Sequence, residues 1–327
     1  MRFSVVIPTF RRPEALLACV AALRAQDLAG IPFEIVVVDD AGDDSALREL
    51  LAQFSDGPPI RYAPVPGRRG PAAARNLGAE IATGEFLAFI DDDCEPDPNW
   101  LRAFDRAIRA ADADGRVLFG GCVINLDPSN VYATASQNLI DFLYDWYNRD
   151  AQRARFFTTN NIAVSRESFL AFGGFDPSFP RAAAEDRDFC DRWREARGRL
   201  QSVPDAIVHH VHRLSLPAFV GQHLGYGRGA VYLHEARQRR GAELPRIEPL
   251  GFYRKLVLWP FRQDFGWRAP VLGALAVVSQ AAYAFGYYTE RFRRGKVSRS
   301  SVDPRPTRPP RMASRRDTPR VRSSTDR

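Results

Sequence analysis

Short apolar runs alternate along the first part of the chain with longer amphipathic stretches. Between the runs, apolar residues recur at helical spacing, with Pro13 and Ser45 placed where helices would begin. The predicted strands cover residues 3–8, 33–38, 60–64 and 85–90. The predicted helices cover residues 13–24, 45–54, 70–82 and 98–111. This alternation is typical of an α/β fold with a mostly parallel sheet flanked by helices.

Two of the predicted strands end in acidic residues. Asp39 and Asp40 follow the second strand, and Asp91, Asp92 and Asp93 follow the fourth. Ligands bind open α/β sheets beyond the carboxyl ends of their strands, so both clusters are expected to face one crevice. The alternative is that these acids are solvated loop residues or helix caps. Three adjacent carboxylates need a counter-charge, however, and the pattern favours Mn²⁺ or Mg²⁺ together with a nucleoside diphosphate.

Basic residues are distributed unevenly. The chain carries 46 Lys and Arg against 39 Asp and Glu, but thirteen of the basic residues and three of the acidic ones lie in 291–327. Residues 1–290 are therefore slightly acidic, and no nucleic-acid partner is expected for the folded part. The only lysines are Lys255 and Lys296. Their positions exclude a phosphate-binding, kinase-type or pyridoxal-binding lysine in the first 254 residues.

Six segments in a fixed order resemble family 2 of the inverting, nucleotide-sugar-dependent glycosyltransferases, which have the GT-A fold. They are VVIPTFRRPEAL (5–16), EIVVVDDAGDD (34–44), GPAAARNLG (70–78), FLAFIDDDCEPDPNWL (86–101), TTNNIAVSRESFLAFGGFD (158–176) and EDRDFCDRW (185–193). The resemblance implies a Rossmann-like GT-A catalytic domain over residues 1–240. Its nucleotide-sugar half would cover about 1–115 and its acceptor half about 116–240.

The resemblance also implies a nucleotide-sugar site in the first half. Asp39 or Asp40 would hydrogen-bond the base, and Arg75 would lie near the donor phosphates. In the Asp-x-Asp motif, Asp91 would lean toward the ribose or sugar and Asp93 would ligate the metal, Mn²⁺ or Mg²⁺. The residues implied to bind the nucleotide sugar are Pro8, Thr9, Asp39, Asp40, Arg75, Asp91 and Asp92.

The catalytic residues that the resemblance implies begin a predicted helix. Asp186 is the expected general base, with Glu185 beside it, because an inverting transfer needs a carboxylate to take the proton of the acceptor hydroxyl. Both acids also suit a simple helix cap. All five histidines lie between 209 and 234. His209 or His212 is the candidate for a further metal ligand beside Asp91 and Asp93, with a structural role as the alternative.

The predicted activity is metal-dependent, inverting transfer of one sugar from a nucleotide-diphosphate sugar, with a UDP-sugar favoured, to a glycan or lipid-linked acceptor. Arg192 and Trp193 directly follow the acids, and no separate Gln-x-x-Arg-Trp motif follows, which favours single transfer over polymerisation. One alternative is a nucleotidyltransferase, which usually has a glycine-rich loop and lysine after the first strand. The other is a non-catalytic binding protein, which is expected to lose an acidic cluster.

The C-terminal third predicts a helical, membrane-associated segment over 241–290. Residues 269–288 carry no charge, and 251–268 mix aromatic with basic side chains, as at a membrane interface. Basic residues on both sides favour an in-plane helix on the cytoplasmic face of the membrane, with a buried hairpin as the alternative. No apolar leader precedes the first strand, so no signal peptide is expected. Residues 291–327 are predicted to be disordered, and 225–229 to form a turn between helices.

Overall fold

The computed structural model describes residues 1–300 apart from 28–29, 112–115, 152, 181–182, 212 and 244–247, with only the backbone described over 295–300. The chain divides into two units, Met1–Arg291 and Phe292–Arg327. The first unit contains the sheet, the candidate site and most of the last helix.

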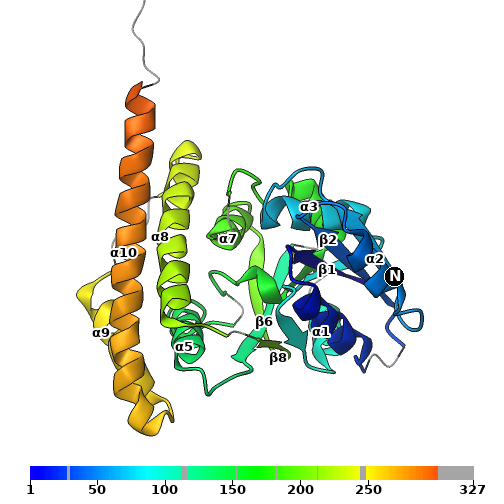
Figure 1. Ribbon diagram of the computed structural model, residues 1–327, viewed down its shortest axis with the longest axis horizontal. Helices are drawn as coiled ribbons and strands as arrows, with labels where there is room; N and C mark the ends of the chain where they lie inside the picture. The colour runs from blue at the N-terminus through cyan, green and yellow to red at the C-terminus, as the bar shows by residue number, and fades with distance from the viewer. Residues whose placement is uncertain are drawn as a thin grey trace, which may run out of the picture. The chain divides into compact units, whose positions relative to one another are not determined.

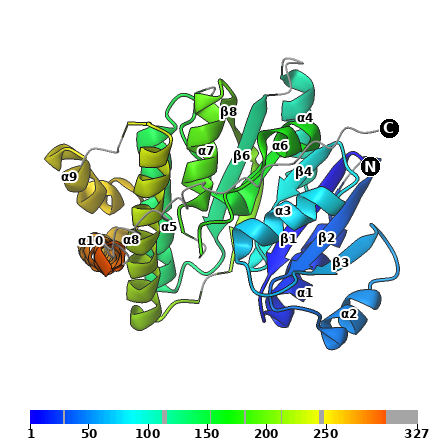
Figure 2. The same ribbon diagram turned by 90° about the horizontal axis from the view of Figure 1, so that it is seen from above.

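One eight-stranded sheet, with strand order β3-β2-β1-β4-β7-β6-β8-β5, runs through this unit (Figures 1 and 2). Its first half is parallel: β1 (Phe3–Thr9) pairs with β2 (Phe33–Asp39) and β4 (Phe86–Phe89), and β2 pairs with β3 (Ile60–Pro64). Every residue of β1 and β2 is buried. Helices cover both faces of these strands, which explains why their sequences are continuous apolar runs rather than alternating ones.

The second half of the sheet is mixed. Strand β7 (Ile162–Ser165) runs antiparallel to both β4 and β6 (Val117–Asn125). Strand β8 (Arg199–His210) is parallel to β6 and antiparallel to β5 (Cys94–Pro96). The β5–β8 pairing brings the chain just after the three aspartates directly opposite the histidine-rich end of β8.

The first four helices begin and end within two residues of their predicted bounds. They are α1 (Pro13–Arg24), α2 (Ser45–Ala52), α3 (Pro71–Ile81) and α4 (Trp100–Ala110). Helices α1 and α4 pack on one face of the sheet and α3 on the other. The N-cap of α2 is Asp44 and not the predicted Ser45, because the Asp44 carboxylate accepts the backbone N–H groups of Ala46 and Leu47.

The second half of the unit adds longer helices. They are α5 (Val131–Tyr147), α6 (Arg166–Phe172), α7 (Glu185–Glu195) and α8 (Leu216–Arg239), with a short 3-10 helix, η1 (Thr159–Asn161). The predicted turn at 225–229 is wrong, since these residues lie inside α8. Glycine at 227 instead permits close packing, because a Cβ there would overlap the carbonyl oxygen of Tyr283.

The C-terminal elements are α9 (Leu250–Leu258), η2 (Trp259–Arg262), η3 (Gly266–Arg268) and α10 (Ala269–Ser300). Helix α10 lies beside α8 (Figures 1 and 2), and its Leu272 and Leu275 pack with Phe219 of α8 and Ala135 of α5. The stretch 266–294 is long and apolar enough to cross a membrane, and 44% of its most apolar window is buried. The chain remains helical to Ser300, into the stretch predicted to be disordered, while 301–327 lie outside the described residues.

Candidate functional site

A cavity of about 1330 Å³ lies at the carboxyl ends of β1 and β4. Most of the predicted site residues line it, including the three aspartates and the pair that begins α7. Asp39 and His209 are not among the lining residues, and His212 lies outside the described residues. The predicted residues that line the cavity are Pro8, Thr9, Asp40, Arg75, Asp91, Asp92, Asp93, Glu185 and Asp186.

Arg75 joins the two acidic groups of the cavity. It projects from α3, where it is 2% exposed, and its guanidinium donates to Asp91 Oδ1 at 2.7 Å and to Glu185 Oε1 at 3.1 Å. A bridging cation of this kind stabilises carboxylates that would otherwise repel each other. Arg75 therefore fixes Asp91, after β4, relative to Glu185, at the start of α7.

Asp92 points toward α1 and β1. Its carboxylate accepts the hydroxyl of Thr9 at 2.7 Å and lies 3.3 Å from the guanidinium of Arg12. Burial raises the pKa of Asp92 to about 6, although the hydrogen bond from Thr9 and the charge of Arg12 oppose this shift. Thr9 and Asp92, each predicted to bind the nucleotide sugar, thus form one hydrogen-bonded unit at the cavity wall.

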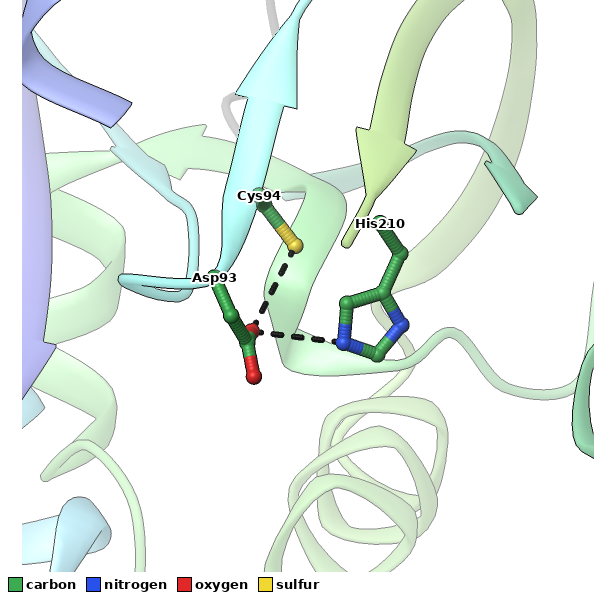
Figure 3. Close-up of side chains that lie close together, drawn as sticks. All are labelled: Asp93, Cys94 and His210. Atoms are coloured by element: carbon green, nitrogen blue, oxygen red, sulfur yellow. Dashed lines mark hydrogen bonds and ion pairs between the residues drawn. The ribbon is translucent and has the colours of Figure 1, made fainter. Parts of the chain in front are cut away.

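Asp93 faces the end of β8 (Figure 3). Its Oδ1 lies 3.3 Å from Nε2 of His210 and 3.9 Å from Sγ of Cys94, and its Oδ2 accepts Arg12 at 2.7 Å. Burial lowers the pKa of His210, but the hydrogen bond and charge of Asp93 outweigh it and leave the pKa raised. The three potential ligand atoms of Asp93, Cys94 and His210 lie within 4.8 Å of one another.

This cluster fits a divalent cation through two of its three members. Burial raises the pKa of the Cys94 thiol well above its usual value, and sulfur is a soft ligand that suits neither Mn²⁺ nor Mg²⁺. Asp93 and His210 remain, and a carboxylate with an imidazole suits Mn²⁺ better than Mg²⁺, which prefers oxygen ligands.

Asp39 and Asp40 organise the loops on the nucleotide side. Asp39 accepts the Ala41 N–H at 2.8 Å and the Tyr62 hydroxyl at 3.1 Å, away from the cavity. Asp40 accepts the N–H groups of Arg69 and Gly70, at 2.8 and 3.1 Å. Asp40 therefore holds the start of α3 and is the member of the pair that reaches the cavity.

Asp186 and Glu185 differ in their surroundings. Glu185 is 3% exposed and bonded to Arg75, and burial together with repulsion from Asp186 raises its pKa to about 7. Asp186 lines the cavity and accepts the Arg187 N–H at 2.7 Å, and burial raises its pKa as well. Ala184, just before them, has φ +73°, a costly conformation for alanine that is frequent beside functional sites. Among the described residues, Asp186 is thus the member of this pair that has no ion pair with an arginine side chain.

The model of glycosyl transferase family 2 matches residues 4–173, more than half of the chain. The chain belongs to glycosyl transferase family 2. The match includes the acidic clusters and ends before α7, so Glu185, Asp186 and His210 lie outside it.

Curated proteins and solved structures also resemble large parts of the chain. Human polypeptide N-acetylgalactosaminyltransferase 10 is 26% identical over 65% of the chain and 38% of its own length. Glycosyltransferase AglE of Haloferax volcanii is 28% identical over 53% of the chain and 55% of its own length. The chain thus spans between about two fifths and half of these two relatives. The mannosyltransferase PcManGT from Pyrobaculum calidifontis, solved with GDP-Man and Mn²⁺, is similar in structure, with a TM-score of 0.55 and 21% sequence identity. The similarity covers 93% of this chain and 81% of the PcManGT chain, and it supports the GT-A fold.

Two residues of this family 2 site were not predicted from the sequence. Arg12 bonds to Asp92 and Asp93, but its sequence signal is only a pair of arginines after β1. His210 lies beside Asp93, whereas its predicted neighbour His209 pairs with Glu95 in the β5–β8 ladder. Successive strand residues face opposite sides of a sheet, so only one of the two histidines can face Asp93.

Proposed function

We propose that this family 2 chain is a metal-dependent, inverting glycosyltransferase that moves one sugar from a nucleotide-diphosphate sugar to an acceptor hydroxyl. The observation that carries the proposal is the placement of two groups around one cavity. Asp91, Asp93 and His210 suit a cation and a diphosphate, and Asp186 suits the acceptor side. Arg75 connects the two through Asp91 and Glu185.

Asp93 and His210 would hold the ion, Mn²⁺ in preference to Mg²⁺. When bound, the ion would neutralise the negative charge that develops on the departing diphosphate. Arg12, whose side chain is 58% exposed, offsets the charges of Asp92 and Asp93. The cluster therefore has both the ligands and a counter-charge that a metal–diphosphate site needs.

The protein's own part in the transfer is to remove one proton and to fix the geometry. Asp186 would take the proton of the acceptor hydroxyl while that oxygen bonds to the anomeric carbon, and the bond to the diphosphate oxygen breaks with its electron pair on the leaving group. The raised pKa of Asp186 makes it a stronger base. Glu185, held by Arg75, would position Asp186 and Asp91 and not act as the base.

The donor is proposed to be a UDP-sugar, with a GDP-sugar as the second choice. UDP-sugars are the commonest donors expected from the family resemblance, while the solved PcManGT structure contains GDP-Man. Asp40, Pro8 and Thr9 line the side of the cavity where β1 and β2 end, which suits a nucleotide.

The C-terminal segment is proposed to hold the enzyme on the cytoplasmic face of a membrane. Trp267 and Phe261 are 84% and 55% exposed, next to Arg262 and Arg268. Aromatic and basic side chains together are typical of a membrane interface, and basic residues before and after the uncharged stretch 269–288 favour an in-plane helix over a single span.

A donor-turnover assay with charge-removing variants tests the proposal. The wild-type protein is incubated with UDP- and GDP-sugars in Mn²⁺, with water as the acceptor of the sugar, and release of the nucleoside diphosphate is measured. Asp186→Asn should slow turnover about 10²- to 10⁴-fold while leaving nucleotide affinity unchanged. Glu195→Gln is the control, because Glu195 lies on the exposed end of the same helix. Normal turnover by Asp186→Asn together with a dead Glu185→Gln would reverse the two roles, and no turnover of any donor by the wild type would contradict the proposed activity.

A further inference from the structure

The cavity that holds the acidic residues continues to the C-terminal helices. Its lining includes Asp186 of α7 and also Leu143 of α5, Phe252 of α9 and Tyr287 of α10. The family 2 match ends at residue 173, so α8, α9 and α10 lie outside it. The cavity therefore has a carboxylate wall from the sheet and α7, and a largely aromatic and apolar wall from α5 and the C-terminal helices.

Helix α10 is fixed against α8 and does not form a loose anchor. A Cβ at Gly286 would overlap the carbonyl oxygen of Leu224, so the two helices touch backbone to backbone there, as they do at Gly227. Two polar contacts fix the register. Nδ1 of His234 lies 2.9 Å from the Tyr287 hydroxyl, and the Tyr232 hydroxyl donates to Glu290 at 3.2 Å. The tyrosines of α10 are thereby held in defined positions at the cavity wall.

The opposite face of α10 is an uncharged, exposed stripe. No residue of 271–288 carries a charge, and Val277 and Phe285 are 54% and 65% exposed. Three uncharged residues of α10 belong to both surfaces: Tyr283 and Tyr288 line the cavity and are also 38% and 63% exposed, and the exposed Ala284 lies between them. The cavity therefore opens onto the apolar stripe.

We propose that the acceptor is a membrane lipid with a hydroxyl-bearing headgroup, which enters the cavity sideways past Tyr283 and Tyr288. This inference rests on the proposed function and adds the class of acceptor. The lipid chain would remain against the stripe and the apolar wall, while the headgroup reaches Asp186. Tyrosine suits such an opening, since its ring contacts the chain and its hydroxyl contacts the headgroup. The exposed apolar side chains beside the opening, such as Val277 and Phe285, would contact a lipid chain but not a soluble glycan.

Photolabelling with a simple amphiphile tests the opening. The probe is dodecyl glucoside with a diazirine in its alkyl chain, used below its critical micelle concentration on the full chain, and labelled peptides are mapped by mass spectrometry. We expect labelling of cavity-lining residues of α10 and α5. Unlabelled hexyl, octyl and decyl glucosides should compete with the probe, and their potency should rise at least tenfold from the hexyl to the decyl compound. Glucose should not compete.

Ala284→Trp fills the opening, because Ala284 both lines the cavity and is exposed. It should reduce cavity labelling at least fivefold, while Ala281→Trp, exposed on the same helix but outside the cavity, should not. Labelling confined to the outer stripe, equal labelling of the two variants, or competition independent of chain length would overturn the proposal. If Ala284→Trp does not fold, the competition series on the wild type decides. Labelling needs no donor, so failure of donor turnover with cavity labelling intact would refute the proposed function and not the lipid opening.

Discussion

Replacing Arg75 by methionine removes the cation that bridges Asp91 and Glu185 while keeping a side chain of similar length. The side chains of Arg75 and Glu185 are 3% and 4% exposed, whereas that of Asp91 is 32% exposed. The loss therefore falls mainly on Glu185, which would be left as a buried charge without its partner. Removing one member of a buried pair costs about 3–5 kcal/mol of unfolding free energy.

The cost should depend on pH, because protonation can relieve Glu185. Its pKa is about 7 with Arg75 present and should rise further without it, because the charge of Arg75 opposes the rise. At pH 5.5 Glu185 is protonated in both proteins, whereas at pH 8 it is mostly ionised in the wild type and protonated to a greater extent in the variant. One unit of further rise in the pKa corresponds to about 1.4 kcal/mol, so the destabilisation should be larger at pH 8 than at pH 5.5 by up to about that amount.

Urea denaturation followed by tryptophan fluorescence, at pH 5.5 and at pH 8, measures the loss of unfolding free energy and its dependence on pH. Arg106→Met is the control, since Arg106 and its partner Asp205 are 63% and 75% exposed, and an exposed pair contributes at most about 1 kcal/mol. In a Glu185→Gln background the pH dependence of the Arg75→Met effect should disappear. A loss below about 1 kcal/mol at pH 8, or one that does not change with pH, would refute the assignment of Arg75 as the bridge.

Two further predictions concern stability. Glu185 binds its proton more tightly in the folded protein, where its pKa is about 7, than in the unfolded chain, where its pKa is 4.5. The resulting stabilisation is complete below pH 4.5 and is lost as the pH rises through 7. Glu185→Gln should therefore flatten this decline in stability, whereas the exposed control Glu49→Gln should not. Gly227→Ala should destabilise the protein by about 1–3 kcal/mol in the same denaturation assay, because its Cβ would overlap the backbone of Tyr283. The control Gly221→Ala has open space in the same helix and should stabilise the protein by up to about 1 kcal/mol. Equal effects of the two substitutions would mean that α10 is not packed on α8.

Local pattern was sufficient to predict the parallel half of the fold. The continuous apolar runs of β1 and β2 and the helical spacing of α1 are properties of neighbouring residues. The acids after β2 and β4 were expected at one edge of the sheet because parallel strands end at the same edge. The mixed half was not predicted in detail, because short strands such as β7 are defined by pairing with distant segments.

The histidine beside Asp93 depends on such a distant pairing. His209 and His210 are equivalent by composition, and only the register that sets Cys94 opposite His210 distinguishes them. The last helix is a second case. Its lack of charge predicted a membrane segment, but its packing on α8 depends on glycines 227 and 286, which lie far apart in the sequence and match only in space. Helix α10 thus combines features of the predicted membrane helix and of the buried hairpin, because one face packs on the domain and the other is exposed.

Nucleotide binding with and without metal tests the central claim most directly. Isothermal titration calorimetry with UDP and GDP, in Mn²⁺ and in EDTA, compares the wild type with Asp93→Asn, His210→Gln and the neighbouring control His209→Gln. The wild type and His209→Gln should bind one of the nucleotides at least about tenfold more tightly in Mn²⁺, equivalent to about 1.4 kcal/mol. This gain should be lost in Asp93→Asn and reduced in His210→Gln. Affinity that does not change with Mn²⁺, or a gain that survives Asp93→Asn, would contradict the account.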